Sequence, residues 1–175
     1  MTAPTETELA EALRGVDLFA GVSEQALRTL ASQMRVFDYG PGEQVVEEDT
    51  GYGHGRMYVI IRGTARVEVE GKAVAGIGPG DYFGEISLLD NKPRSATVIA
   101  TSNLTVAGLA SWNLHATLME EPQIAINMLE GLAARLRSAI GRAVDTASAA
   151  ARSPKWAAER PARRREQLRD GRTIL

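Results

Sequence analysis

The stretch from residue 35 to residue 109 constrains the fold most, because apolar and polar residues alternate there in short segments separated by glycine-rich turns. A period of two is typical of strands with one buried face, and short strands between such turns are typical of antiparallel sheets. The turns around 38–42 and 76–81 both combine Gly with Pro and Asp. We therefore predict a mainly β protein, an antiparallel β jelly roll with strands at 44–47, 56–61, 64–69, 96–101 and 104–108.

Helical patterns flank this region. Short helices are predicted over 6–13 and 23–34, with Ser23 as the N-cap of the second, and over 112–119, with Ser111 as its N-cap. Pro122 opens the longest helix, which we expect to continue to about residue 150. Its apolar residues recur at spacings of four and three, the pattern of a two-helix seam, which predicts a homodimer through residues 122–144. The seam comprises Ala125, Leu129, Leu132, Leu136, Ala139 and Ala143, with Ile126 and Ile140 beside them.

Composition is ordinary for a globular protein, with 44% hydrophobic and 24% charged residues in a chain of 175. There is no cysteine, and the polar, acidic N-terminus has none of the features of a signal peptide. No apolar run approaches the ~18 residues of a membrane span. We therefore expect a cytoplasmic protein without membrane contact. The formal net charge of −2 is unevenly spread, since residues 152–175 carry eight basic and three acidic side chains.

One segment carries recognisable chemistry: Phe83 to Leu89, followed after three polar residues by Pro93 to Val98. Gly84 allows the backbone to approach a ligand, and a helix beginning at Ile86 would offer free backbone N–H groups to an anion. Arg94 can direct two donors at phosphate oxygens. Glu85 would repel a phosphate, so it more plausibly accepts hydrogen bonds from a sugar hydroxyl. The pattern favours a site for a sugar phosphate.

This ordered set resembles the phosphate-binding cassette of cyclic nucleotide-binding domains, as in bacterial cAMP receptor proteins and kinase regulatory subunits. The similarity extends over roughly residues 10–145. It implies that Glu85 holds the ribose 2′-hydroxyl and Arg94 the cyclic phosphate. It does not imply a phosphodiesterase or cyclase activity. Leu88 and Leu89 are expected in the core. The resemblance also implies that the ligand is lined by Gly84, Ile86, Ser87, Ser95 and Ala96.

Recognition of the base is less well defined by the sequence. In cAMP receptor proteins the long helix supplies a polar pair to the adenine, and the matching positions here are Ala139 and Ile140. The base could instead meet Ser138, stack on Trp156 of the tail, or make apolar contact alone. Ser95 after the arginine resembles the cAMP-type cassette, whereas cGMP-selective relatives often carry threonine there. We therefore expect cAMP as the ligand, with cGMP as the less favoured alternative.

The chain holds only two histidines, His54 and His115, on different predicted elements, which argues against a metal-dependent jelly-roll enzyme. We expect no enzymatic activity and no metal. Residues 1–145 are predicted to form the nucleotide-binding domain, with the jelly roll at about 35–109 and C-terminal helices at about 111–145. Residues 146–175 are predicted to form a basic Arg/Ala-rich tail, partly disordered or a short helix, too short for the helix-turn-helix domain of related transcription factors.

These features predict a stand-alone sensor that changes conformation on binding a cyclic nucleotide and regulates an unknown protein partner. Two alternatives remain open. The chain could be a nucleotide-independent dimerisation or scaffold module, which ligand-dependent stability would exclude. It could also regulate nucleic acid through its basic tail, which predicts binding that weakens steeply with salt.

Overall fold

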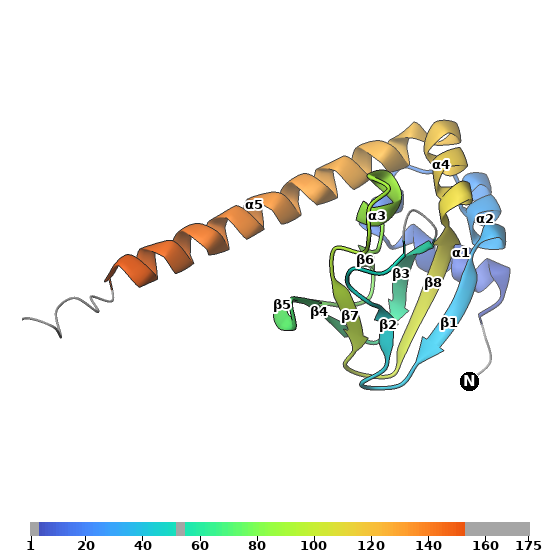
Figure 1. The fold of residues 1–175 in the computed structure, drawn as a ribbon. Coiled ribbons are helices and arrows are strands. Elements are labelled where there is room, and N and C mark those ends of the chain that lie inside the picture. The colour runs from blue at the N-terminus through green and yellow to red at the C-terminus, as the bar shows by residue number, and fades with distance from the viewer. Residues whose placement is uncertain (1–3, 52–54, 153–175) are drawn as a thin grey trace, which may run out of the picture. The chain divides into compact units, whose positions relative to one another are not determined.

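The computed structural model describes residues 4–51 and 55–152 (Figure 1). The chain divides into two compact units, and the boundary falls between Leu132 and Ala133. The first unit contains every strand found in residues 4–51 and 55–152, and its architecture positions the candidate site. The second unit contains the C-terminal part of the last helix.

The first unit is built on a jelly roll of two antiparallel four-stranded sheets (Figure 1). The predicted fold class is therefore confirmed. The first sheet has the order β1 (Arg35–Tyr39), β8 (Leu104–Ala110), β3 (Arg56–Arg62), β6 (Tyr82–Phe83). The second has the order β2 (Gln44–Val46), β7 (Thr97–Ala100), β4 (Ala65–Val69), β5 (Lys72–Ile77).

Alternation along β3 separates two hydrophobic cores. Met57 and Val59 belong to a cluster shared with the helices, whereas Ile60 belongs to a cluster between the two sheets. The same division holds in β8, where Leu109 faces the helical cluster and Val106 the cluster between the sheets. Even-numbered side chains at the start of β3 therefore point into the interior of the roll.

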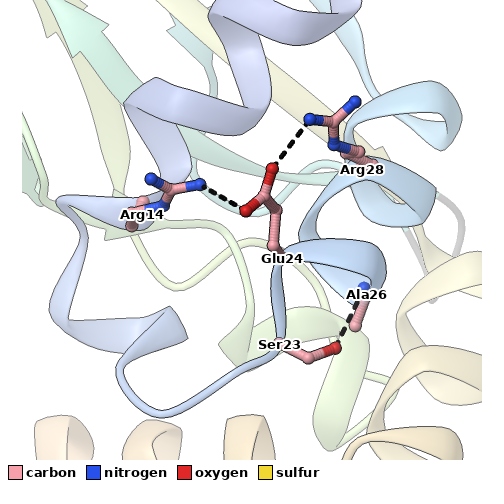
Figure 2. A network of polar contacts seen from close by, with 5 residues as sticks. All are labelled: Arg14, Ser23, Glu24, Ala26 and Arg28. Atoms are coloured by element: carbon pink, nitrogen blue, oxygen red, sulfur yellow. Dashed lines mark hydrogen bonds and ion pairs between the residues drawn. The ribbon is translucent and has the colours of Figure 1, made fainter.

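Short helices cover the outer face of the first sheet (Figure 1): α1 (Glu6–Arg14), the 3₁₀ turn η1 (Asp17–Phe19), α2 (Glu24–Gln33) and α4 (Ser111–Glu120). The hydroxyl of Ser23 accepts a hydrogen bond from the Ala26 N–H at 3.2 Å, so its predicted N-cap role is confirmed. Glu24, the first residue of α2, pairs with Arg14 of α1 at 3.4 Å and with Arg28 at 2.7 Å (Figure 2). These three side chains are more than half exposed.

The prediction of Ser111 as an N-cap is wrong. Helix α4 begins at Ser111 itself, and Ala110 is the N-cap without a side-chain hydrogen bond. The strand β8 leads directly into the helix, and Ser111 is buried at 8% exposure. Its N–H donates to the Gly55 carbonyl at 3.0 Å, so this residue links the start of α4 to the loop before β3.

Helix α5 (Pro122–Arg152) begins in the first unit and continues through the second. Ile124 and Met128 are buried in the helical core, and the Asn127 side chain donates to the carbonyls of Leu18 at 3.0 Å and Ala20 at 2.9 Å. The Tyr82 hydroxyl donates to the Met128 carbonyl at 3.4 Å. It also occupies the space that a side chain at Gly131 would need, so this glycine has a packing role.

Candidate functional site

The cassette starts where β6 ends. Gly84 follows Phe83 with a φ of +82°, a left-handed conformation that an L side chain would strain. Glu85 then leads into α3 (Ile86–Leu89), a single helical turn in which the N–H groups of Leu88 and Leu89 donate to the Glu85 carbonyl at 2.9 and 3.0 Å. The N–H groups of Ile86 and Ser87 precede these bonds, so the helix itself gives them no partner. The predicted helical turn is therefore present.

Arg94 lies inside this turn and is only 8% exposed. Its Nη1 donates to the Gly84 carbonyl at 2.6 Å and to the Ser87 hydroxyl at 3.0 Å, and its Nη2 donates to the Arg56 carbonyl at 2.8 Å. The guanidinium thus joins the cassette to the first residue of β3. All three acceptors are neutral, so these hydrogen bonds hold the guanidinium without neutralising its charge.

Two glycines make room for the guanidinium. A Cβ built on Gly84 would lie 2.7 Å from Arg94 Nη1, and a Cβ built on Gly55 would lie 2.5 Å from Nη2. Side chains at either position would displace the arginine or the backbone. Sequence reasoning identified Gly84 but missed Gly55, whose signal is its position directly before the strand that faces the cassette.

The segment before the undescribed residues 52–54 also has a defined role. The Asp49 N–H donates to the Arg94 carbonyl at 3.0 Å, and the Arg94 N–H donates to the Thr50 carbonyl at 2.9 Å. This reciprocal pair fixes the backbone of Arg94. The sequence showed only an irregular loop here, and the pairing could not be read from it.

The site contains two opposite charges, the Arg94 guanidinium and the Glu85 carboxylate. Burial lowers the pKa of Arg94, while Tyr58 and the Glu85 carboxylate act in the opposite direction. An arginine still keeps its charge under all ordinary conditions. Glu85 is 1% exposed, so the site combines a buried cation and a buried carboxylate on one short segment. This arrangement can hold a phosphate at one end and a hydroxyl-bearing group at the other.

The structure brings Gly84, Glu85, Ser87 and Arg94 together, with Ile86 in the same turn and 40% exposed. Ser95 and Ala96 follow Arg94 directly, the first exposed and the second partly buried. Their roles toward a ligand stay predictions.

Leu88 is buried as predicted, but the prediction that Leu89 is a core residue is wrong, since it is 42% exposed. A single helical turn buries one face only, and Leu89 shares its outer face with Ile86 three residues earlier.

Three of the predicted base contacts belong to the second unit. Ser138, Ala139 and Ile140 lie on α5 in the second unit, where all three are exposed. Ser138 accepts a hydrogen bond from Arg142 at 2.7 Å. Trp156 lies outside the described residues. How the base is recognised stays a prediction.

Two negative findings apply to the described residues. Within 4–51 and 55–152, no three His, Cys, Asp or Glu side chains form a group that could hold a metal ion. Over the same ranges, no helix combines the length and apolar character needed to cross a bilayer.

The sheets and the cassette together define a jelly roll that carries a candidate anion site. Residues 36–121 match the model of the cyclic nucleotide-binding domain family, and the chain belongs to this family through that domain. The match contains the whole cassette.

Known relatives agree with this assignment. The chain is 30% identical over 134 residues to a CRP-like cAMP-activated global transcriptional regulator of Mycobacterium tuberculosis, covering 73% of this chain and 58% of the relative. It is 36% identical over 98 residues to a cAMP-dependent protein kinase regulatory subunit of Debaryomyces hansenii, covering 55% of this chain and 21% of that protein. The chain therefore spans little more than half of the first relative and a fifth of the second.

Similarity to solved structures supports the fold. The crystal structure of a cyclic nucleotide-binding domain from Methylobacillus flagellatus superposes with a TM-score of 0.68 at 26% identity. The superposition covers 81% of this chain and 83% of that one. It therefore includes more than the segment matched by the family model.

Proposed function

We propose that this protein is a cyclic nucleotide sensor, with cAMP as the first-choice ligand. Arg94 would bind the cyclic phosphate, Glu85 the ribose 2′-hydroxyl, and the backbone at Ile86 and Ser87 would add donors to the phosphate. The observation that carries the proposal is the buried Arg94 guanidinium, framed by two glycines and held only by neutral acceptors. The cAMP-activated and cAMP-dependent relatives support the choice of nucleotide.

Binding would exchange partners rather than fill an empty site. A phosphate at the cassette would take hydrogen bonds that Arg94 now gives to Gly84, Ser87 and Arg56. Charge-assisted bonds to an anion are roughly twice as strong as neutral ones, so the exchange favours the ligand. The cassette would be drawn toward the phosphate as a result.

This movement has a route to the first turns of α5. Leu88, a buried apolar residue of the cassette, belongs to the same core cluster as Ile124 and Met128. Tyr82, at the base of the cassette strand, donates to the Met128 carbonyl. A ligand that prefers one packing of this cluster shifts the population by its differential affinity for the two states. The start of α5 would therefore respond to the nucleotide.

The output would be regulation of a protein partner, with a homodimer through residues 122–144 as the first assembly to test. Exposed apolar side chains support it: Leu136 is 61%, Ile140 55% and Val144 58% exposed in the second unit. Apolar residues that recur on an exposed helix are typical of helix pairing. Sedimentation with and without nucleotide would show whether the assembly responds to the ligand.

A scaffold module that does not bind nucleotide is the second candidate. The specific observation in its favour is that Arg94 is already hydrogen-bonded within the protein, so the fold is satisfied without ligand. A role in nucleic-acid regulation would depend on the basic tail, of which residues 153–175 lie outside the described residues. Truncation after Ala151 would abolish binding of that kind and leave nucleotide binding intact.

Thermal unfolding with cAMP and cGMP tests the proposal directly. A ligand present at 100 times its dissociation constant stabilises the folded state by about 2.7 kcal/mol, and we expect this shift for the native protein with cAMP. Arg94→Lys keeps a charge but loses the planar fork, so most of the shift should disappear. Lys92→Ala, in the same loop and exposed, is the matched control and should keep it.

No shift with either nucleotide at millimolar concentration would reject the sensor and favour the scaffold. An equal shift in Arg94→Lys would reject the assignment of Arg94.

A further inference from the structure

A second guanidinium, that of Arg56, points into the interior of the jelly roll. Arg56 is the first residue of β3, and its position in the alternation places it on the same face as Tyr58 and Ile60. Its Cζ lies 5.5 Å from the centre of the Phe37 ring. A Cβ built on Gly108 would lie 2.9 Å from its Cδ, so the side chain crosses β8 where that strand has no side chain of its own.

The Arg56 side chain is not satisfied by the rest of the protein. Its Nε is buried and has no hydrogen-bond acceptor. Among the described residues, its guanidinium forms neither a hydrogen bond nor an ion pair, and its charge lies over the Phe37 ring. Arginine carries five donors, and a buried donor without an acceptor is costly. An acceptor supplied from outside the protein would remove that cost.

The backbone of the same residue forms part of the Arg94 site. The Arg56 carbonyl accepts from Arg94 Nη2 at 2.8 Å, and it lies 3.0 Å from a Cβ built on Gly84. Arg56 is therefore adjacent in space to the cassette as well as to Phe37. Its side chain starts at the wall of the candidate phosphate site and ends on an aromatic ring.

We propose that Arg56 is a second phosphate-binding residue, which leaves the Phe37 ring and donates to one non-bridging oxygen of the cyclic phosphate while Arg94 binds the other. This inference rests on the proposed function and deepens it. Arg56 reaches the oxygen from the sheet, and Arg94 from the loop after the cassette. The buried Glu85 carboxylate on the same segment offsets part of the repulsion between the two cations.

Calorimetric titration with cAMP tests the role of Arg56. Arg56→Met keeps an unbranched side chain over Phe37 but removes the donors and the charge. The loss of a charge-assisted hydrogen bond should weaken binding by about 10- to 100-fold. Arg56→Lys keeps the charge without the planar fork, so its affinity for cAMP should lie between those of the native protein and Arg56→Met. Arg62→Met, exposed at the other end of β3, is the matched control and should bind like the native protein.

Unfolding of the ligand-free variants separates binding from packing. Since the Arg56 Nε has no acceptor, we expect Arg56→Met to unfold at the same temperature as the native protein or higher. A lower unfolding temperature with unchanged affinity would show that Arg56 serves packing only, and would overturn the inference.

The two diastereomeric phosphorothioates of cAMP then identify the oxygen. Each carries sulfur, a weaker acceptor, at one of the two non-bridging positions. In the native protein each diastereomer should bind more weakly than cAMP. In Arg56→Met this difference should disappear for one diastereomer and persist for the other. In Arg94→Lys it should disappear for the other diastereomer instead.

If the two diastereomers lose the same affinity relative to cAMP in Arg56→Met as in Arg94→Lys, the assignment of Arg56 to a phosphate oxygen is overturned. If the native protein binds cAMP and Arg56→Met binds it equally well, the inference fails while the proposed function stands. If the native protein binds neither cAMP nor cGMP, both fail.

Discussion

Two arginine networks of the first unit differ in burial and in the charge of their partners. Arg14 and Arg28 bind the Glu24 carboxylate on the surface of α1 and α2, where all three side chains are more than half exposed (Figure 2). Arg94 is buried and bonded to two backbone carbonyls and a hydroxyl. The surface arginines share a carboxylate as their partner, whereas the three acceptors of Arg94 are neutral.

Under the proposed function, this difference separates the network that responds to a ligand from the one that serves structure. Exposed ion pairs contribute little to stability, because water and salt screen them. Arg14 and Arg28 also attract a second anion less strongly, since both already pair with a carboxylate. A buried guanidinium on neutral acceptors can exchange those acceptors for a stronger one. The carboxylate partner drawn in Figure 2 therefore marks a structural contact, and the neutral partners of Arg94 mark the candidate site.

The substitution Gly84→Ala should break the buried network most severely. The left-handed φ costs an L residue about 1 to 2 kcal/mol, and the new Cβ would press on Arg94 Nη1 and the Arg56 carbonyl, so we expect a loss of about 2 to 4 kcal/mol in the free energy of unfolding. Gly80→Ala is the matched control, with a φ of +89° and open space around its Cβ. Urea unfolding of both variants measures the difference, and equal losses would contradict a steric role for Arg94.

An intermediate effect is expected at Asn127, which is neutral and partly buried. Its amide donates to the carbonyls of Leu18 and Ala20, and Asn127→Ala removes both bonds, at a cost of about 1 to 2 kcal/mol. Gln123→Ala, which removes only the bond from Gln123 to the Asn127 side chain, should cost less. A cost for Asn127→Ala no larger than that of its control would show that these bonds add nothing to the attachment of α5.

Glu24→Gln should have the smallest effect, and one that depends on pH. The hydrogen bond from Arg28, then the charges of Arg28 and Arg14, hold the pKa of Glu24 below its usual 4.5. The pairing therefore stabilises the fold above pH 4.5, and the contribution is lost as the pH falls through the lower folded value. Denaturation at pH 7 should show a slight loss that vanishes in acid. A difference that instead grows as the pH falls would contradict this sign.

Much of the fold follows from local pattern. Burial alternates over the first residues of β3 and is continuous along the apolar β8, and Ser23 and Pro122 mark helix starts, so these elements were predicted within two residues of their ends. Strand β5 was not predicted, because its residues are mostly exposed and Gly76 resembles a turn. Strands β1 and β6 were also not assigned, since β1 runs into a glycine turn and β6 has only two residues. Alternation is visible in sequence only where one face is buried.

Some residues of the candidate site could be predicted from local sequence, and others could not. Gly84, Glu85 and Arg94 are close in sequence, so their types and spacing suffice to propose them together. Gly55 and Arg56 reach the site from a different strand, through the pairing of β3 with β6, and only the sheet register reveals this. The exposure of Leu89 likewise depends on α3 being a single turn.

Gly131 gives the long helix two properties at one position. It leaves room for the Tyr82 hydroxyl, which donates to the Met128 carbonyl, and as a glycine it weakens the helix there by about 1 kcal/mol relative to alanine. It lies just before the boundary between the two compact units. An attachment point and a weak point of α5 are therefore neighbours, and a side chain added at residue 131 would stabilise the helix locally while it disrupts the contact with Tyr82.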